Sequence, residues 1–124
     1  MANKRELLKV QLRLALASLN TLFEGVPPGR IQFTPATTET AAFVLELATL
    51  EGWRGNLVDL SFPVGLGGGT KSLCDLYRVL AEIRGKFPED EPHASWDGTR
   101  EHYELVQGAS QFLERLYDAE FRPA

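Results

Sequence analysis

The chain has 124 residues, of which 44% are hydrophobic and 24% are charged, with a formal net charge of −4 and one cysteine. This balance excludes a disordered or fibrous chain, and Cys74 has no second cysteine with which to form an intramolecular disulfide. A single cysteine needs no oxidising compartment, so we expect a cytoplasmic protein. No run approaches about 20 apolar residues, so we expect no membrane span. The acidic net charge leads us to expect no nucleic-acid partner.

The first predicted element is a helix over residues 5–23. Its apolar residues recur at steps of three and four, which is the period of a helix with one buried face. They are Leu8, Leu12, Ala15, Leu19, Leu22 and Phe23. Leu7, Val10 and Leu14 widen this stripe beyond what one neighbouring helix would cover. We therefore expect either a central core helix packed between others, which we favour, or a second contact surface on this helix.

A loop around Pro27 and Pro28 ends the first helix, because proline lacks a backbone donor and disfavours helical geometry in the residue before it. Residues 30–33 then alternate like a short extended segment. The second helix follows, and Gly52 stands where its C-terminal cap is expected. Three residues offer its N-terminal cap, so its start stays open by about a turn; they are Thr34, Thr37 and Thr38.

Residues 53–62 fit two structures. A short helix would bury Leu57 and Leu60, whereas a strand would place Val58, Leu60 and Phe62 on one face; we favour the helix. Residues 63–69 contain four glycines, and so many flexible residues cost too much backbone entropy for a regular element. We expect a loop there.

The third helix is predicted from Thr70 or Ser72 to Gly85, with Asp75 placed three residues after Ser72 as in a capping box. A polar loop follows, and Asp97 or Thr99 caps the last and longest helix. These elements predict an all-α fold and a single helical domain over residues 1–124. Its architecture would be an irregular bundle of four main helices plus a short fifth helix over residues 53–62.

The segment before the third helix has features of a phosphate-binding loop, since glycines, a lysine and a hydroxyl precede a helix N-terminus. Thr70 stands where the Walker pattern requires glycine, and only 52 residues follow Ser72, too few for the parallel sheet of a nucleotide hydrolase. We favour a flexible connector and keep binding of an anion or nucleotide as the alternative. The candidate anion-binding residues are Gly67, Gly68, Gly69, Thr70, Lys71 and Ser72.

No catalytic set emerges from the remaining residues. Cys74 lies among apolar positions of the third helix, which indicates an inert thiol. His93 and His102 lack the compact spacing of metal ligands on one helix face. We therefore expect no catalytic residue, no metal and no cofactor, and a protein that is more an interaction module than an enzyme.

Charge and tryptophan placement favour a protein partner. Residues 1–30 hold five basic and two acidic residues, whereas residues 87–124 hold three basic and nine acidic ones. In an oligomer, the basic first helix would meet the acidic last third of a neighbour. Two tryptophans lie at element boundaries, where they plug the end of a core or anchor a partner. The candidate interaction surface is Arg30, Trp53, Arg54 and Trp96, and the expected partner is another protein or a second copy of the chain.

Residues 14–60 resemble the bacterial effector-associated domains, which are small death-domain-like helical adaptors. Three stretches carry the likeness: Leu14 to Leu19, Gly25-Val26 with Arg30-Ile31-Gln32-Phe33-Thr34, and Gly55 to Leu60. After Leu60 the chain departs from that family with a glycine loop and two long helices. The resemblance implies like-with-like adaptor binding in bacterial signalling or defence, without catalysis.

Overall fold

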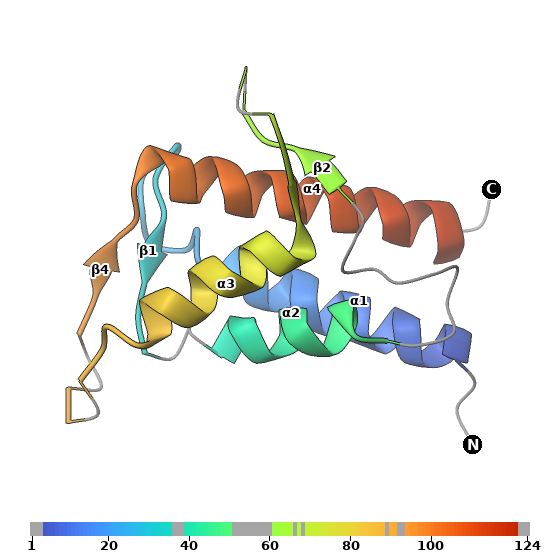
Figure 1. The fold of residues 1–124 in the computed structure, drawn as a ribbon, viewed down its shortest axis with the longest axis horizontal. Helices are drawn as coiled ribbons and strands as arrows, with labels where there is room; N and C mark the ends of the chain where they lie inside the picture. Colours follow the sequence, from blue (N-terminus) through green and yellow to red (C-terminus); the bar gives the residue numbers. More distant parts are fainter. Residues whose placement is uncertain are drawn as a thin grey trace.

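In a computed structural model, the chain forms helices and two small antiparallel sheets (Figure 1). The structure describes residues 4–35, 39–50, 61–65, 67, 69–88, 90–91 and 94–121. Within them the helices are α1 (Lys4–Thr21), α2 (Thr40–Ala48), α3 (Leu73–Arg84) and α4 (Arg100–Phe121). The strands are β1 (Gln32–Phe33), β2 (Ser61–Pro63), β3 (Thr70–Ser72) and β4 (Trp96–Asp97). The prediction of an all-α fold is therefore wrong, because the fold is mixed, although mostly helical.

Each sheet has two strands. β1 pairs with β4, so that Phe33 lies opposite Trp96, and β2 pairs with β3, so that Phe62 lies opposite Lys71. These strands are two or three residues long, which is too short for an alternating apolar pattern to show how the strands pair. The extended segment predicted at residues 30–33 is confirmed as β1, and Phe62 of the alternative strand lies in β2, but β3, β4 and the pairing of the strands were not predicted.

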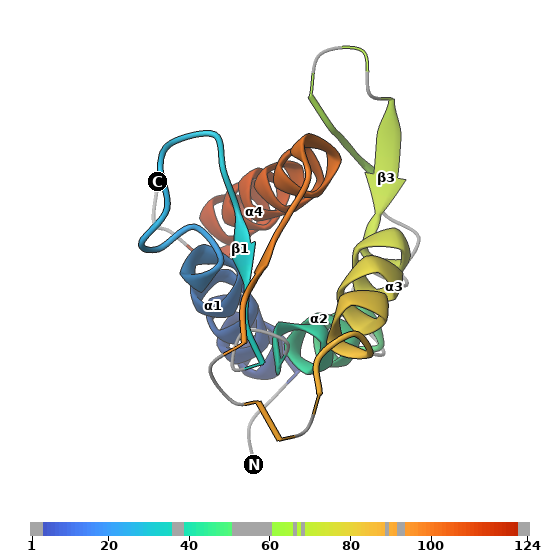
Figure 2. The same ribbon diagram turned by 90° about the vertical axis from the view of Figure 1, so that its left-hand side faces the viewer.

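The helices surround one hydrophobic core, and the view along the bundle shows how they are arranged (Figure 2). α1 packs against both α2 and α4, and α2 also packs against α3. α1 thus packs between two other helices, as the favoured interpretation expects, but Leu7, Val10 and Leu14, which widen its apolar stripe, stay exposed. Its buried side chains include Leu8, Leu12 and Leu19, which are fully enclosed.

α2 begins later than the sequence suggested. Its first residue is Thr40, and Glu39 at the N-cap makes no side-chain capping bond. The Thr40 hydroxyl is buried and lies 2.6 Å from the hydroxyl of Ser18, so this threonine joins α2 to α1 instead of capping the helix. The predicted caps Thr37 and Thr38 and the predicted end at Gly52 lie outside the described residues.

The predicted helix over residues 53–62 is wrong at its end, because Ser61 and Phe62 belong to β2. Residues 53–60 lie outside the described residues. Phe62 is buried and stacks on Phe112 of α4, with ring centroids 5.6 Å apart. The strand form therefore gives Phe62 a place in the core.

The glycine-rich segment forms the tip of the β2–β3 hairpin. Gly65, Gly67 and Gly69 adopt positive φ angles between 55° and 80°, which favour glycine because it lacks a Cβ atom. The amide of Val64 donates to the carbonyl of Gly69 and closes this tip. The loop predicted for this segment is therefore confirmed, and its flanks are strands.

α3 is capped as the sequence predicted. Ser72 is the N-cap, and its hydroxyl accepts from the amide of Asp75 while the Asp75 carboxylate accepts from the amide of Ser72. Thr70, the alternative start, lies in β3. No helix among the described residues has the length and apolar character needed to cross a membrane.

Candidate interaction surfaces

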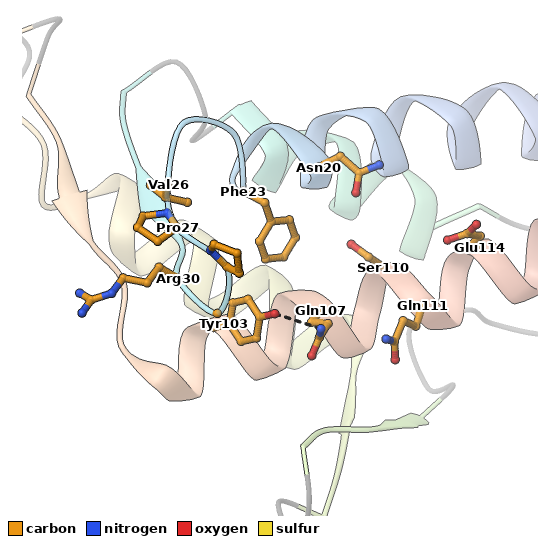
Figure 3. A pocket seen from close by; sticks show the side chains of 12 residues that line it. Asn20, Phe23, Val26, Pro27, Arg30, Tyr103, Gln107, Ser110, Gln111 and Glu114 are labelled. Carbon is orange, nitrogen blue, oxygen red and sulfur yellow. Dashed lines mark hydrogen bonds between the residues drawn. The ribbon is translucent and has the colours of Figure 1, made fainter.

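Arg30 lies at the edge of a pocket of about 410 Å³ between α1, the loop after it and α4. Phe23 and Tyr103 meet edge to face in this pocket, with ring centroids 5.6 Å apart, and Gln107 donates to the Tyr103 hydroxyl. Figure 3 shows the Arg30 guanidinium directed away from the pocket. The pocket therefore offers aromatic and amide groups, while the Arg30 charge faces outward.

A second pocket, of about 680 Å³, continues along the α1–α4 seam and shares Asn20 and Glu114 with the first. Arg13 lines it, and its Nε donates to the hydroxyl of Tyr117 at 2.9 Å. The Arg13 guanidinium also lies over the Tyr117 ring, 5.6 Å from the centroid. The two pockets form a shallow groove along the outside of the bundle.

Trp96 is half-buried at the end of the core. Its ring lies 6.2 Å from Phe33 and 5.7 Å from His102, between centroids, and the ammonium of Lys86 lies 4.8 Å from its centroid. The β1–β4 pairing brings Trp96 to the same end of the molecule as Arg30, which precedes β1 by two residues. These contacts fit the interpretation that Trp96 closes the end of the hydrophobic core.

The other two members of the candidate interaction surface, Trp53 and Arg54, lie outside the described residues. That four-residue surface therefore stays a prediction.

The start of α4 uses His102 as a capping residue. The Nδ1 atom of His102 accepts from the amide of Thr99 at 2.9 Å, and the Thr99 hydroxyl accepts from the amide of His102. This reciprocal arrangement replaces the usual glutamate of a capping box with histidine. Thr99 was a predicted cap, but the capping role of His102 was missed. The sequence signal for it was a histidine, whose ring nitrogen can accept a hydrogen bond, placed three residues after the hydroxyl of Thr99.

Burial of the His102 ring lowers its pKa below the ordinary value of 6.5, although the charge of Glu101 acts in the opposite direction. A backbone N–H can only donate, so Nδ1 must carry a lone pair in this arrangement. The cap therefore requires neutral His102.

The candidate anion-binding residues lie in and after the hairpin tip. Gly67 and Gly69 belong to the tip, Thr70 and Lys71 are exposed in β3, and Gly68 lies outside the described residues. At the N-terminus of α3, the amide of Ser72 donates to the Asp75 carboxylate at 2.9 Å, which lowers the pKa of Asp75. Asp75 thus already supplies a negative charge where a bound anion would lie, which favours the connector interpretation.

The candidate catalytic and metal-binding groups do not come together in the described part of the chain. Cys74 is half-buried on α3, His102 caps α4, and His93 lies outside the described residues. Among the described residues, no group of three or more His, Cys, Asp or Glu side chains is arranged to hold a metal ion.

Two basic residues of α1, Arg5 and Arg13, contact α4 of the same chain. Arg5 donates to the backbone carbonyl of Glu120 and lies over the Phe121 ring, 5.2 Å from its centroid. A cation at the carbonyl end of a helix is favourable because of the helix dipole. Arg5 and Arg13 thus already have partners in α4, where the sequence had suggested the acidic third of a neighbouring molecule.

Three large aliphatic side chains of α1 remain exposed. Leu7 is 43% exposed, Val10 49% and Leu14 41%. Their spacing of three and four residues places them on one face of the helix. We call these three residues the α1 outer stripe. It corresponds to the second contact surface that the wide apolar pattern of the first helix had suggested.

Comparisons of this chain with protein-family models, with curated protein sequences and with solved structures give no significant match.

Proposed function

We propose that the protein is a non-catalytic interaction module, an adaptor or regulatory subunit, that docks partners on the α1 outer stripe. The observation that carries this proposal is the exposure of Leu7, Val10 and Leu14 in one row of a helix. Single exposed aliphatic residues are ordinary, but a row of them at helical spacing is the pattern with which helices pack together.

Docking of a partner on the α1 outer stripe would bury apolar side-chain area. Burying a whole leucine or valine side chain contributes roughly 1.5–3 kcal/mol. Each residue of the stripe is nearly half exposed in this chain, so docking of a partner would contribute roughly 1 kcal/mol per residue. The neighbouring α1–α4 groove adds amide groups that suit the polar rim of an interface and aromatic groups that suit its core.

The resemblance of residues 14–60 to bacterial effector-associated domains supports the same class of function. Leu14 belongs both to the α1 outer stripe and to the first stretch that carries the likeness. An adaptor role in bacterial signalling or defence follows as part of the proposal.

The test is affinity capture from a lysate of the source organism with three tagged proteins: the wild type, Val10→Glu and Leu45→Glu. Leu45 is the matched control because it is 40% exposed but lies on α2. We expect mass spectrometry to identify a protein, or untagged copies of the chain, that the wild type and Leu45→Glu retain and Val10→Glu loses. Equal retention by all three proteins would contradict the proposal.

A further inference from the structure

The charges beside the α1 outer stripe are arranged symmetrically. Glu6 precedes Leu7 by one residue, and Arg13 precedes Leu14 by one residue. A separation of seven residues is nearly two helical turns, so Glu6 and Arg13 lie in line on the same flank of the stripe. Both side chains are exposed. One flank thus carries an acid and a base about 10 Å apart along the helix.

The opposite flank of the stripe faces α2. Ser18 lies on that flank, and its hydroxyl contacts the Thr40 hydroxyl of α2 at 2.6 Å. The flank with Glu6 and Arg13 faces away from α2 and is exposed, and both residues also make contacts within their own chain.

The orientation of a partner helix decides which flanks meet. When two copies of a helix pair antiparallel about a two-fold axis, each flank faces the equivalent flank of the other copy. When they pair in parallel, opposite flanks face each other, and here α2 covers one of them. An antiparallel pair centred on Val10 places Leu7 of each copy at the level of Leu14 of the other.

Building on the proposed function, we propose that the α1 outer stripe binds a second copy of this chain, with the two α1 helices antiparallel and the two-fold axis near Val10. Glu6 of each copy then lies beside Arg13 of the other, which forms two symmetry-related ion pairs at the edges of an apolar seam. The surface is thus complementary to itself in both apolar spacing and charge.

Arg13 can make this contact without leaving α4. Its Nε donates to Tyr117, but a guanidinium has five N–H donors, and within the described part of the chain the other four make no hydrogen bond. The contact with Tyr117 holds the side chain in place, which reduces the entropy lost on pairing.

The dimer is expected to dissociate on dilution. Stable complexes bury about 800 Å² on each partner, whereas the stripe consists of three half-exposed side chains on three turns of one helix. High salt weakens the association further, because the ion pairs are at the surface.

The first experiment is sedimentation velocity of the pure protein from about 1 to 500 µM, a range that covers weak association. We expect a monomer–dimer equilibrium for the wild type. Val10→Glu places two carboxylates together at the two-fold axis and should raise the dissociation constant by more than about tenfold. Val10 is half exposed, so this variant should still fold, which a circular dichroism melt checks.

Leu45→Glu is the matched control. Leu45 follows Thr40, the α2 residue in contact with α1, by five positions, so it lies about 140° around α2 from that contact. We expect this variant to dimerise like the wild type. A wild type that stays monomeric, or equal effects of Val10→Glu and Leu45→Glu, would overturn the proposal.

Charge exchange tests the antiparallel orientation. Glu6→Arg places two arginines together at both edges and Arg13→Glu places two glutamates there, so each single variant should weaken the dimer. The double variant restores both pairs and should recover most of the wild-type affinity. A double variant as weak as the single variants would refute the antiparallel arrangement.

The two proposals can fail separately. If the pure wild type is monomeric but captures a different protein in a manner that Val10→Glu abolishes, self-association is refuted and the interaction module stands. If neither association is seen, both proposals fail.

Discussion

The Nδ1 atom of His102 lies 2.9 Å from the amide nitrogen of Thr99 and accepts its hydrogen. This bond ties the first turn of α4 to the end of β4, next to Trp96 and Phe33. It exists only while the imidazole is neutral, because protonation would turn Nδ1 into a donor.

We therefore expect a loss of stability in mild acid. The pKa of His102 is lower in the folded chain than the ordinary value of 6.5, so the unfolded chain binds a proton at a higher pH than the folded chain does. The contribution of neutral His102 is complete above about pH 6.5 and falls as the pH drops from there towards the folded-state pKa. Urea unfolding between pH 5 and 7.5 measures this slope.

His102→Gln is the control for this prediction. Glutamine can accept from the Thr99 amide but does not titrate. The pH dependence of the free energy of unfolding between pH 5 and 7.5 should be smaller in this variant than in the wild type. An unchanged slope would show that other groups cause the acid sensitivity.

Ser72→Ala removes the cap of α3. The hydroxyl of Ser72 accepts from the amide of Asp75, and loss of such a cap costs about 1 kcal/mol. Thr70→Ala, an exposed change two residues earlier, should cost less. Chemical denaturation of both variants compares the two costs, and equal costs would argue against the cap.

Gly108→Ala reverses the usual effect of alanine in a helix. Alanine in a helix interior is normally about 1 kcal/mol more favourable than glycine. At Gly108, however, a Cβ atom would lie 2.6 Å from the carbonyl oxygen of Pro63 in β2. We expect destabilisation by about 1–3 kcal/mol, measured by thermal or chemical unfolding.

Gly85→Ala is the matched comparison for Gly108. Gly85 has a φ of −66°, and the nearest atom to an added Cβ would be the carbonyl oxygen of Glu82 at 3.5 Å. This variant should be neutral or more stable by less than about 1 kcal/mol. Equal changes in stability at both glycines would mean that β2 does not approach α4 closely enough to exclude a Cβ atom at Gly108.

Leu7 and Leu8 are neighbours in sequence with opposite environments. Leu8 is fully buried and Leu7 is 43% exposed. Leu8→Ala should lower the free energy of unfolding of the monomer by about 2–5 kcal/mol. Leu7→Ala should lower this free energy by much less, and should weaken self-association instead. Unfolding at low protein concentration separates the two effects, and a large loss for Leu7→Ala would place it in the core.

The sequence predicted those features of the fold that depend on nearby residues. Ser72 and Asp75 are three residues apart, so their mutual capping was visible in the sequence. The extended segment at residues 30–33 was also visible, but its pairing was not, because Phe33 lies opposite Trp96 across 63 positions and two-residue strands do not encode their partner.

The candidate site was predictable to a similar extent. The width of the apolar pattern singled out Leu7, Val10 and Leu14, but the favoured interpretation was a core helix packed between others, and only the structure shows that these three residues are exposed. The hydrogen bonds of Arg5 and Arg13 with α4 depend on the packing of α1 against α4. No local sequence pattern encodes which helices become neighbours.

The contact between Arg5 and the Glu120 carbonyl joins positions 115 residues apart. α1 can pack against α2 as soon as both have been synthesised, but its side facing α4 stays without a partner until the last helix leaves the ribosome. At about 5–20 residues per second, that interval lasts several seconds. Throughout it, the apolar flank of α1 that α4 finally covers is open to chaperones and to other nascent chains, so the order of synthesis sets when this chain is most prone to misassembly.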